Sequence, residues 1–392
     1  MKIDRKNPRH WWLLLKQGAY ALLAAFFRPF VSKHRKHLIV LYGHQFNGNL
    51  KALYREWETS FVQHFDMFVL CLEPDSARAL EQKGVQVLRC NKIHDMLFAG
   101  GATAILTDHG PHLLTPLIHF SSVRFIDVWH GVPFKGFTPE DFAPLHRYDE
   151  AWVTSETLKR AYTSEFGFDE KKVKCLGYAR TDRMFSGSST TSLFRETLGI
   201  PKDKKLVVYA PTWHHEHGAK SPLVLGQERG NFLTAVDKMC QERGAVLVVR
   251  SHLNSVAIKA LPPAIVQCSQ QRFADTEQLL LETDVLVADW SSIVFDYLPL
   301  KRPAIFLDVP PPFRLGKTIT PNYRYGPVAD NIEDLLSQLD AALAEPGQFV
   351  AANEDKYLSA EADLYDPALA GRAARSQLGR LVELCQDIDP GL

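Results

Sequence analysis

A short apolar run ends in a group of polar residues within Thr283–Tyr297, which reads T-D-V-L-V-A-D-W-S-S-I-V-F-D-Y. Val285–Ala288 is typical of a buried parallel strand, and Asp289 ends it. Ser291 and Ser292 stand where a helix would begin, because apolar residues follow at helical spacing. Such a point presents backbone N–H groups, hydroxyls and the positive end of a helix dipole, which favour a phosphate. The alternative is that one serine only caps the helix.

A histidine and a lysine follow a second strand-like run, in Asp127–Lys135 (D-V-W-H-G-V-P-F-K). The predicted strand ends at Val128 and a turn follows, so His130 lies at a strand's carboxyl end, where open α/β sheets bind ligands. A histidine titrates near neutrality and can therefore remove a proton from an attacking hydroxyl. Lys135 can offset phosphate charge. The alternative is a structural histidine.

Three further groups of polar residues stand at or near strand-like runs. Val248–Leu253 presents Arg250 and His252, which can contact phosphate oxygens by a fork and by a hydrogen bond. Its alternative is a surface ion pair plus a capping histidine. Two other segments offer Thr212 in Tyr209–Trp213 and Arg180 with Asp182 in Gly177–Asp182. The last segment is equally well explained as a hinge contact.

The elements that must position these residues alternate between strands and helices. Strands are predicted at 38–42, 67–72, 85–88, 104–107, 123–128, 151–154, 173–176, 206–210, 245–249, 265–268, 285–288 and 304–307. Helices are predicted near 50–64, 232–242 and 368–385. Two β-α halves predict two doubly wound parallel sheets with the ligand cleft between them. The predicted domains are 1–36, 37–185 and 186–392, with the linker at 186–192.

Composition narrows the class of protein. The chain has 392 residues, a hydrophobic fraction of 46%, a charged fraction of 23% and no net charge, as in ordinary globular proteins. Its six cysteines lack any metal or disulfide spacing, which predicts buried free thiols and a cytosolic environment. His214, His215 and His217 form a cluster without an obvious carboxylate or cysteine partner. We therefore predict no catalytic metal, no cofactor and no nucleic-acid partner.

The first 36 residues carry nine Lys or Arg and one acidic residue, Asp4. Trp11–Phe27 is largely apolar but short and interrupted for a spanning helix, which needs about 20 apolar residues. No small-residue cleavage site follows, so a secretory signal is a poor fit. Aromatic and basic residues together predict an amphipathic helix in the membrane interface. The alternative is a helix that packs on the protein's own surface.

The polar segments, taken in order, resemble the CDP-glycerol glycerophosphotransferase family, the primases and polymerases of teichoic-acid-like polymers. The family pattern runs W-H-G-T-P-x-K, G-x-P-R-x-D, Y-A-P-T-W-R, R-x-H-P and T-D-Y-S-S-x-x-F-D. Here it is matched, across roughly residues 100 to 310, by Trp129–Lys135, Gly177–Asp182, Tyr209–Trp213, Arg250–His252 and Thr283–Asp296. The number and order of the motifs carry the resemblance.

The resemblance implies a GT-B fold, with two facing Rossmann-like domains and the nucleotide held mainly by the C-terminal one. It also implies that His130 and His252 are the functional histidines, one a base and one a group that stabilises the transferred phosphate. Ser291 and Ser292 would hold the donor phosphates. The chain departs from the family pattern at Val132, Ala179, His214, Leu253 and Trp290, where the family usually has Thr, Pro, Arg, Pro and Tyr. The change at His214 puts contacts near Trp213 in doubt.

We therefore expect a peripheral enzyme on the cytoplasmic face of the cell membrane, acting in teichoic-acid-like or capsule synthesis. It would move a polyol phosphate from CDP-glycerol or CDP-ribitol to a hydroxyl of a lipid-linked saccharide or polyol-phosphate acceptor, releasing CMP. A sugar transferase of the same fold and an inactive membrane scaffold are the alternatives. The pattern leaves open glycerol or ribitol, primase or polymerase, the acceptor and the oligomeric state.

Overall fold

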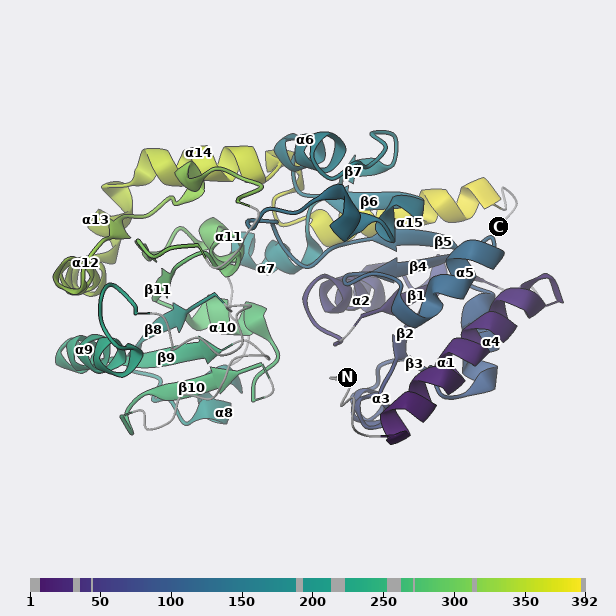
Figure 1. Cartoon of the computed structure of the whole chain (residues 1–392), viewed down its shortest axis with the longest axis horizontal. Helices are drawn as coiled ribbons and strands as arrows, with labels where there is room; N and C mark the ends of the chain where they lie inside the picture. Colours follow the sequence, from purple (N-terminus) through teal and green to yellow (C-terminus); the bar gives the residue numbers. More distant parts are fainter. Residues whose placement is uncertain are drawn as a thin grey trace. The chain divides into compact units, whose positions relative to one another are not determined.

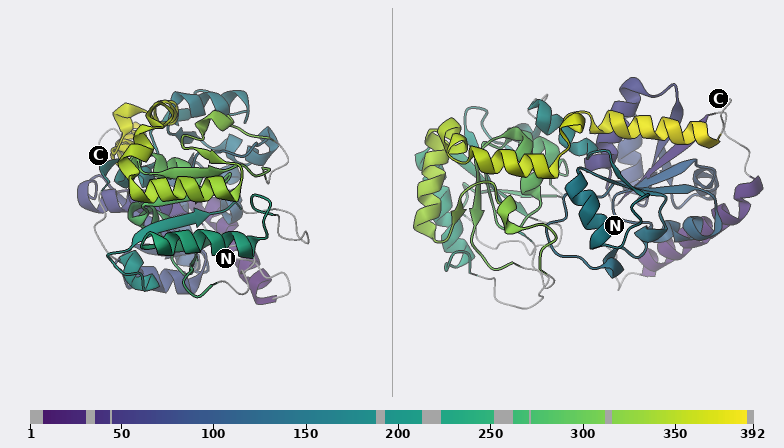
Figure 2. Two further views of the ribbon diagram at one scale, coloured as in Figure 1. Left: turned by 90° about the vertical axis from the view of Figure 1, so that its left-hand side faces the viewer. Right: turned by 90° about the horizontal axis from the view of Figure 1, so that it is seen from above.

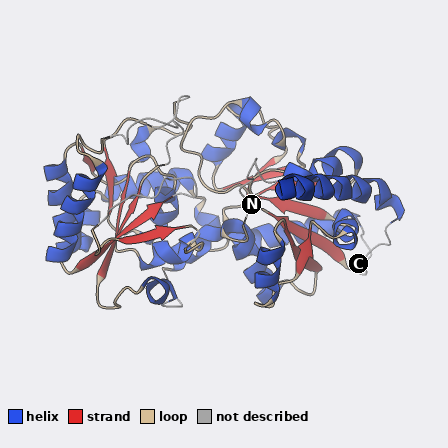
Figure 3. Cartoon of the chain, turned by 60° about the horizontal axis from the view of Figure 1, so that its bottom comes forward, coloured by secondary structure: helices blue, strands red, loops and turns tan. Residues whose placement is uncertain are grey.

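The structure, a computed structural model, describes residues 8–30, 36–43, 45–187, 193–212, 223–251, 262–270, 272–311 and 316–388. The chain divides into two compact units (Figure 1). Unit 1 comprises residues 1–130, 139–182 and 368–392, and unit 2 comprises residues 131–138 and 183–367. Each unit contains a parallel sheet with helices on both faces (Figure 3).

The sheet of unit 1 has seven strands over the described residues, in the order β3-β2-β1-β4-β5-β6-β7, and all pairs are parallel. The strand order reverses between β1 and β4, so the carboxyl ends of these strands form a topological switch point. Buried apolar runs explain why these segments are strands. The strands are β1 (His37–Tyr42), β2 (Phe65–Cys71), β3 (Val87–Arg89), β4 (Ala104–Thr107), β5 (Arg124–Asp127), β6 (Glu150–Val153) and β7 (Val173–Cys175).

Helices cover both faces of this sheet. One face packs against apolar residues of α2, α3 and α15, and α1 lies across α4 and α5 (Figure 1). The helices are α1 (Pro8–Phe27), α2 (Gly48–Ser60), α3 (Pro74–Glu81), α4 (Ile93–Gly100), α5 (Thr115–Phe120), α6 (Glu156–Ser164) and α15 (Ala373–Ile388). The short helix α7 (Asp182–Ser186) spans the point where the chain passes into unit 2.

The sheet of unit 2 has six strands over the described residues, in the order β10-β9-β8-β11-β12-β13, again all parallel. Its switch point lies between β8 and β11, whose central residues are fully buried. The strands are β8 (Lys205–Ala210), β9 (Ala245–Ser251), β10 (Val266–Ser269), β11 (Val285–Ala288), β12 (Ala304–Leu307) and β13 (Val328–Ala329).

One face of this second sheet packs against α9 and α12, whose apolar residues share a core with β8, β9, β11 and β12. The helices of the unit are α8 (Leu193–Leu198), α9 (Arg229–Glu242), α10 (Thr276–Glu282), α11 (Ile293–Tyr297), α12 (Ile332–Ala344), α13 (Pro346–Ala351) and α14 (Glu354–Leu364).

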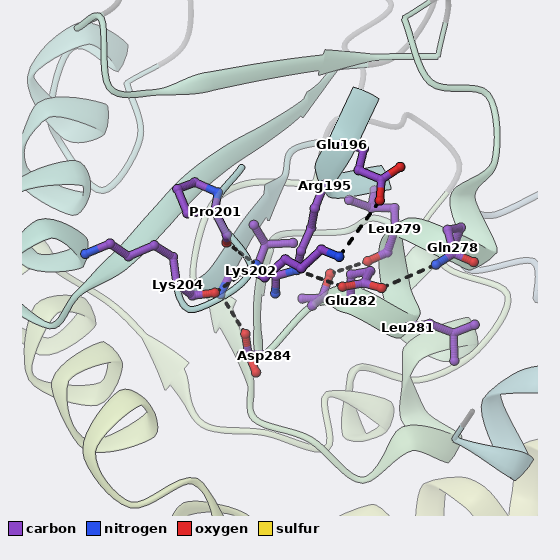
Figure 4. Close-up of polar contacts among 12 residues, drawn as sticks. Arg195, Glu196, Pro201, Lys202, Lys204, Gln278, Leu279, Leu281, Glu282 and Asp284 are labelled. Atoms are coloured by element: carbon purple, nitrogen blue, oxygen red, sulfur yellow. Dashed lines mark hydrogen bonds and ion pairs between the residues drawn. The ribbon is translucent and has the colours of Figure 1, made fainter. Parts of the chain in front are cut away.

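A buried arginine ties α8 to α10 and to the start of β8 (Figure 4). Arg195 Nε lies 2.8 Å from Glu282 Oε2, and its Nη1 donates to the carbonyls of Pro201 and Lys204 at 3.0 and 2.8 Å. Because both members of the ion pair are largely buried, this contact costs desolvation and depends on complete pairing.

The division of the chain differs from the predicted boundaries in two places. The predicted boundary at 185/186 lies near the observed one at 182/183, but residues 368–392 belong to unit 1. The reason is that α15 buries Leu378, Leu381 and Leu384 in the core of unit 1, alongside α2 (Figure 2). Residues 131–138 belong to unit 2, although both flanking segments belong to unit 1.

The first helix, α1, packs with three of its alanines inward and leaves several large apolar residues exposed. Ala21, Ala24 and Ala25 are buried, and a Cβ at Gly100 of α4 would lie 3.0 Å from Ala24. Gln17 donates to the carbonyl of Leu72 at 2.9 Å, and Arg28 donates to the carbonyls of Gly100 and Ala102. The helix is thus docked on unit 1, as the second reading of this segment predicted. None of the described helices combines the length and apolar character that a membrane crossing requires.

Candidate active site

Two histidines stack at the carboxyl ends of neighbouring strands in unit 1. His109 follows β4 and His130 follows β5, and their ring centroids lie 4.2 Å apart with 8° between the ring planes. The two strands pair in parallel, so their carboxyl ends meet at one edge of the sheet. His130 therefore lies at the strand end where the sequence pattern predicted it.

His130 is held in one tautomer by the backbone. Its Nδ1 lies 2.8 Å from the carbonyl oxygen of Asp108. Because a carbonyl only accepts, Nδ1 carries the proton and the lone pair is on Nε2. The residue is exposed to solvent. An exposed imidazole with a basic Nε2 suits a general base, and this role for His130 remains a prediction.

Asp108 also binds the second histidine of the stack. His109 Nδ1 lies 2.8 Å from Asp108 Oδ1, and the Asp108 side chain is buried. Burial lowers the pKa of His109, but the charge and hydrogen bond of Asp108 outweigh this effect and raise it. Gly43 makes room for the carboxylate, since a Cβ there would lie 2.5 Å from Asp108 Oδ1. A positive charge on the His109 ring is thus favoured beside His130.

A buried carboxyl group lies beneath the loop that carries His130. Asp127 Oδ1 accepts the backbone N–H of Trp129 at 3.2 Å, which helps hold Trp129 at a φ of +44°. Its Oδ2 is buried without a hydrogen-bond partner among the described residues. Burial raises the pKa of Asp127 to about 7. Burial therefore favours the protonated form of this carboxyl group.

The backbone around His130 is fixed by Asn49 and Arg180. Asn49 Nδ2 donates to the carbonyls of Val128 and Trp129 at 2.7 and 3.0 Å, and its Oδ1 accepts the N–H of Arg180 at 3.1 Å. Arg180 Nη1 donates to the carbonyl of His130 at 2.6 Å. The structure thus brings two predicted site residues together, with Arg180 contacting the backbone of His130. Substrate binding by Arg180 remains a prediction.

Asp182 is the first residue of α7. Its two carboxylate oxygens accept the N–H groups of Ala373 and Ala374, each at 2.8 Å, at the first turn of α15. Burial raises the pKa of Asp182 to about 6. These contacts agree with the alternative reading of a hinge residue, because the chain passes into unit 2 directly after Asp182. Its predicted role in substrate binding gains no support from them.

In unit 2, Asp289 joins the carboxyl ends of β8 and β11 at the switch point. Its Oδ1 accepts the N–H of Thr212 at 2.8 Å, the Thr212 hydroxyl and the N–H of Trp290 at 2.6 Å. Asp289 is buried. Two residues from separate predicted motifs thus meet at the strand ends where α/β sheets bind ligands.

Ser291 and Ser292 follow directly and are half-buried. Ser292 is the N-cap residue of α11, but its side chain makes no capping hydrogen bond. Side-chain capping, the alternative reading of this motif, therefore does not account for the Ser292 hydroxyl. Binding of donor phosphates by the two serines remains a prediction.

Arg250 is buried at the end of β9 and is engaged by the protein. Its Nη1 donates to the carbonyl of Phe273 at 2.6 Å, and its Nη2 donates to the Thr276 hydroxyl at 2.9 Å. These contacts tie β9 to the start of α10. Arg250 therefore has a structural role. Its predicted contact with a phosphate remains a prediction.

Lys135 is exposed, in the short segment that packs with unit 2. Gly136 N–H donates to the carbonyl of Gly316 at 2.8 Å, and the Thr318 hydroxyl donates to the carbonyl of Lys135 at 2.8 Å. These contacts involve only backbone atoms of Lys135 and Gly136, so the predicted phosphate contact of the Lys135 side chain remains a prediction.

Some of the predicted residues lie outside the part of the chain that the structure describes. These are His252, Trp213, Leu253 and the cluster His214, His215 and His217. Within the described ranges, no group of three or more His, Cys, Asp or Glu side chains is arranged to hold a metal ion. The cysteines Cys71, Cys90, Cys175, Cys240, Cys268 and Cys385 are free thiols, and all but Cys175 are buried.

Several residues around the predicted ones were not predicted from the sequence. Asp108 and His109 directly follow the predicted strand 104–107, so the strand-end rule that selected His130 would also have selected them. Asn49 carried no such signal, because its role depends on contacts with segments distant in the sequence. Asp127 opens the motif that contains His130, and its contact with Trp129 is local.

The chain is similar to known proteins in sequence and in fold. The chain is 27% identical over 207 residues to the teichoic acid poly(glycerol phosphate) polymerase of Staphylococcus epidermidis, covering 46% of this chain and 28% of that protein. It is 29% identical over 284 residues to the teichoic acid ribitol-phosphate polymerase TarL of Staphylococcus aureus, covering 66% and 47%. The chain thus spans less than half the length of either relative.

The fold is shared with a solved structure, the wall teichoic acid polymerase TagF in a histidine variant soaked with CDPG. The TM-score is 0.75 at 17% sequence identity, over 95% of each chain. This likeness confirms the predicted GT-B-like α/β fold class. The family profile described as CDP-Glycerol:Poly(glycerophosphate) glycerophosphotransferase matches residues 21–350, which include every motif discussed above. The chain therefore belongs to this glycerophosphotransferase family.

Proposed function

We propose that the protein transfers a polyol phosphate from a CDP-activated donor to a hydroxyl group of a lipid-linked acceptor in the synthesis of a teichoic-acid-like polymer. The observation that carries the proposal is His130, an exposed imidazole whose Nδ1 proton is directed to the Asp108 carbonyl, in a member of this family. Relatives named as glycerol-phosphate and ribitol-phosphate polymerases support a CDP-polyol donor of either kind.

The proposed step is a phosphoryl transfer. The acceptor hydroxyl attacks the phosphorus that bears the polyol, its proton passes to His130 Nε2, and the bond from that phosphorus to the CMP oxygen breaks. CMP leaves with the electron pair of the broken bond. Such transfers depend mainly on positioning and on stabilisation of phosphate charge. In unit 2 we assign Thr212, Asp289, Ser291 and Ser292 to the donor end.

The predicted histidine His252 and the cations Lys135, Arg180 and Arg250 complete the proposed site residues. Arg180 and Arg250 already make backbone contacts that position the loops of the site. The proposal requires no metal held by the protein.

The donor assay tests this function directly. Purified full-length protein is incubated with a synthetic lipid-linked acceptor and CDP-glycerol, CDP-ribitol, UDP-sugars or GDP-sugars, and the released nucleotide is identified. We expect acceptor-dependent release of CMP from a CDP-polyol alone. Release of a nucleoside diphosphate from a nucleotide-sugar would instead establish the alternative, a sugar transferase.

A matched pair of variants assigns the base. His130→Gln should lower the rate about 10²- to 10⁴-fold, the range typical of a lost general base. His119→Gln is the control, because His119 is an exposed histidine of the same unit that contacts Arg147. Full activity in His130→Gln would rule out the assigned role. A wild type that is inactive with every donor would instead favour the scaffold alternative.

We further propose that α1 attaches the protein to the cytoplasmic face of the cell membrane. Trp12, Leu15 and Phe26 are 70%, 67% and 70% exposed on this helix, while Ala21, Ala24 and Ala25 are buried against unit 1. Large exposed apolar residues are costly in water, and Trp and Phe insert readily into a membrane interface. The nine basic residues among the first 36 add attraction to anionic lipids.

Vesicle sedimentation tests this attachment. Wild-type protein should pellet with vesicles that contain phosphatidylglycerol, and the triple variant Trp12→Ser, Leu15→Ser, Phe26→Ser should remain in the supernatant. Leu358→Ser is the control, since Leu358 is an exposed apolar residue of α14 in unit 2. Equal pelleting of the wild type and the triple variant would contradict the proposal.

A further inference from the structure

Trp290, at the end of β11, carries two cations on its ring. The guanidinium carbon of Arg324 lies 3.6 Å from the ring centroid of Trp290, and Lys317 Nζ lies 4.0 Å from it. The indole is fixed, because its Nε1 donates to the carbonyl of Val309 at 2.7 Å and Phe134 packs 5.5 Å from it. A rigid aromatic surface thus holds two positive charges beside Ser291.

Arg324 is buried but incompletely paired. Only 8% of the residue is exposed, yet its Nε and Nη2 have no hydrogen-bond partner among the described residues. Its Nη1 lies 3.6 Å from Asp308 Oδ1, a long contact to a largely exposed carboxylate. Buried guanidinium donors are normally satisfied, so this arrangement is costly unless an acceptor binds.

The two cations also disfavour one another. Burial lowers the pKa of Arg324, and burial together with the charge of Arg324 lowers the pKa of Lys317. Their segment is nevertheless held in place, because the Tyr325 hydroxyl donates to the carbonyl of Val294 in α11 at 2.6 Å. An anion would supply the missing acceptors and offset the repulsion.

We propose that Arg324 and Lys317, held on Trp290, form a binding site for the diphosphate of a nucleoside diphosphate donor. The inference rests on the proposed function and names two residues of its donor end that no motif contains. A diphosphate fits because its several oxygens match the forked donors of arginine and the point charge of lysine. The site lies directly after β11, one of the two strands at the switch point of unit 2.

Indole is the aromatic side chain that binds cations most strongly. The ring of Trp290 therefore provides the surface on which Arg324 and Lys317 are held.

Calorimetric binding to the full-length protein tests the site with four probes: CDP, CMP, cytidine and inorganic pyrophosphate. Arg324→Gln and Lys317→Gln should each weaken CDP and pyrophosphate binding about 10- to 100-fold, the loss typical of a charge-assisted contact. Cytidine binding should be unchanged. Lys301→Gln is the matched control, because Lys301 is an exposed lysine of unit 2 paired with Glu361.

The outcomes separate this site from the proposed function. If CDP-polyols are not consumed but both variants lose pyrophosphate affinity, the anion site stands and the proposed reaction fails. If CDP and pyrophosphate bind both variants as they bind the wild type, or if cytidine binding falls equally, the site is overturned. Should Arg324→Gln fail to fold, Lys317→Gln and Arg324→Lys decide, with the latter expected to retain most of the pyrophosphate affinity.

Discussion

The charge state of His109 bears directly on the proposed role of His130 as a general base. The parallel rings lie 4.2 Å apart, and Asp108 binds one ring by its carboxylate and the other by its carbonyl. A positive neighbour makes protonation of His130 harder, so the base stays neutral at lower pH. The charged and titratable groups that act on His109 are Asp108, Asp127, Arg180 and His112.

We predict that His109→Phe, which keeps a stacked ring and removes the charge, moves the acid limb of kcat/KM upward by about one pH unit. Asp108→Asn should shift it in the same direction, because His109 then loses the carboxylate that favours its charged form. The measurement is the pH dependence of CMP release, supported by ¹⁵N NMR titration of His130. An acid limb at the same pH in both variants and in the control His119→Phe would exclude this coupling.

Asp127 should make stability depend on pH. Burial raises its pKa to about 7 in the folded protein from 3.8, so the folded state binds the proton more tightly than the unfolded state. Its contribution is therefore fully present below about pH 4 and is lost as the pH rises towards 7. We predict that the Tm of Asp127→Asn, measured by circular dichroism, falls less than that of the wild type between pH 5 and pH 8. If the Tm of the two proteins changed equally with pH, Asp127 would not titrate in this pH range.

Among the elements, α8 depends on one buried ion pair. Arg195 contacts Glu282 and two backbone carbonyls (Figure 4). Lys202, in the same region, is exposed, and its Nζ lies 4.0 Å from Glu196 Oε1. Arg195→Met should lower the free energy of unfolding by about 3 kcal/mol, because Glu282 is left buried without its cation. Lys202→Ala should change it by less than about 0.5 kcal/mol. Urea unfolding checks both values, and equal losses would contradict the argument.

Sequence patterns were most successful in predicting individual strands. The apolar runs at 104–107, 285–288 and 304–307 coincide with β4, β11 and β12, since a strand buried on both faces must be apolar throughout. The two-residue strand β13 was not predicted, because so short a segment has no readable period. The first helix was predicted, but its inward face of alanines was not.

At the scale of the whole molecule, residues 368–392 return to unit 1 and form part of its core. Leu378, Leu381 and Leu384 of α15 are buried with α2 in that core, and each contributes about 2 kcal/mol by burial. Removal of residues 368–392 should therefore raise hydrogen exchange in β1, β2 and β4 of unit 1 and leave β8 and β11 of unit 2 protected. Removal of residues 389–392 alone is the control. Equal exposure of both sheets would show that the units do not keep separate cores.

Local sequence patterns were enough to predict the two parallel sheets, the strand-end positions of His130 and Asp289, and the order of motifs that marks the family. Each of these follows from residues close together in the chain, where periodicity and turn chemistry act. The contacts of Asp182 with Ala373, of Arg250 with Phe273 and of Arg324 with Trp290 became visible in the folded chain alone. Such contacts join segments far apart in sequence, and they form only when packing of the sheets and helices brings those segments together.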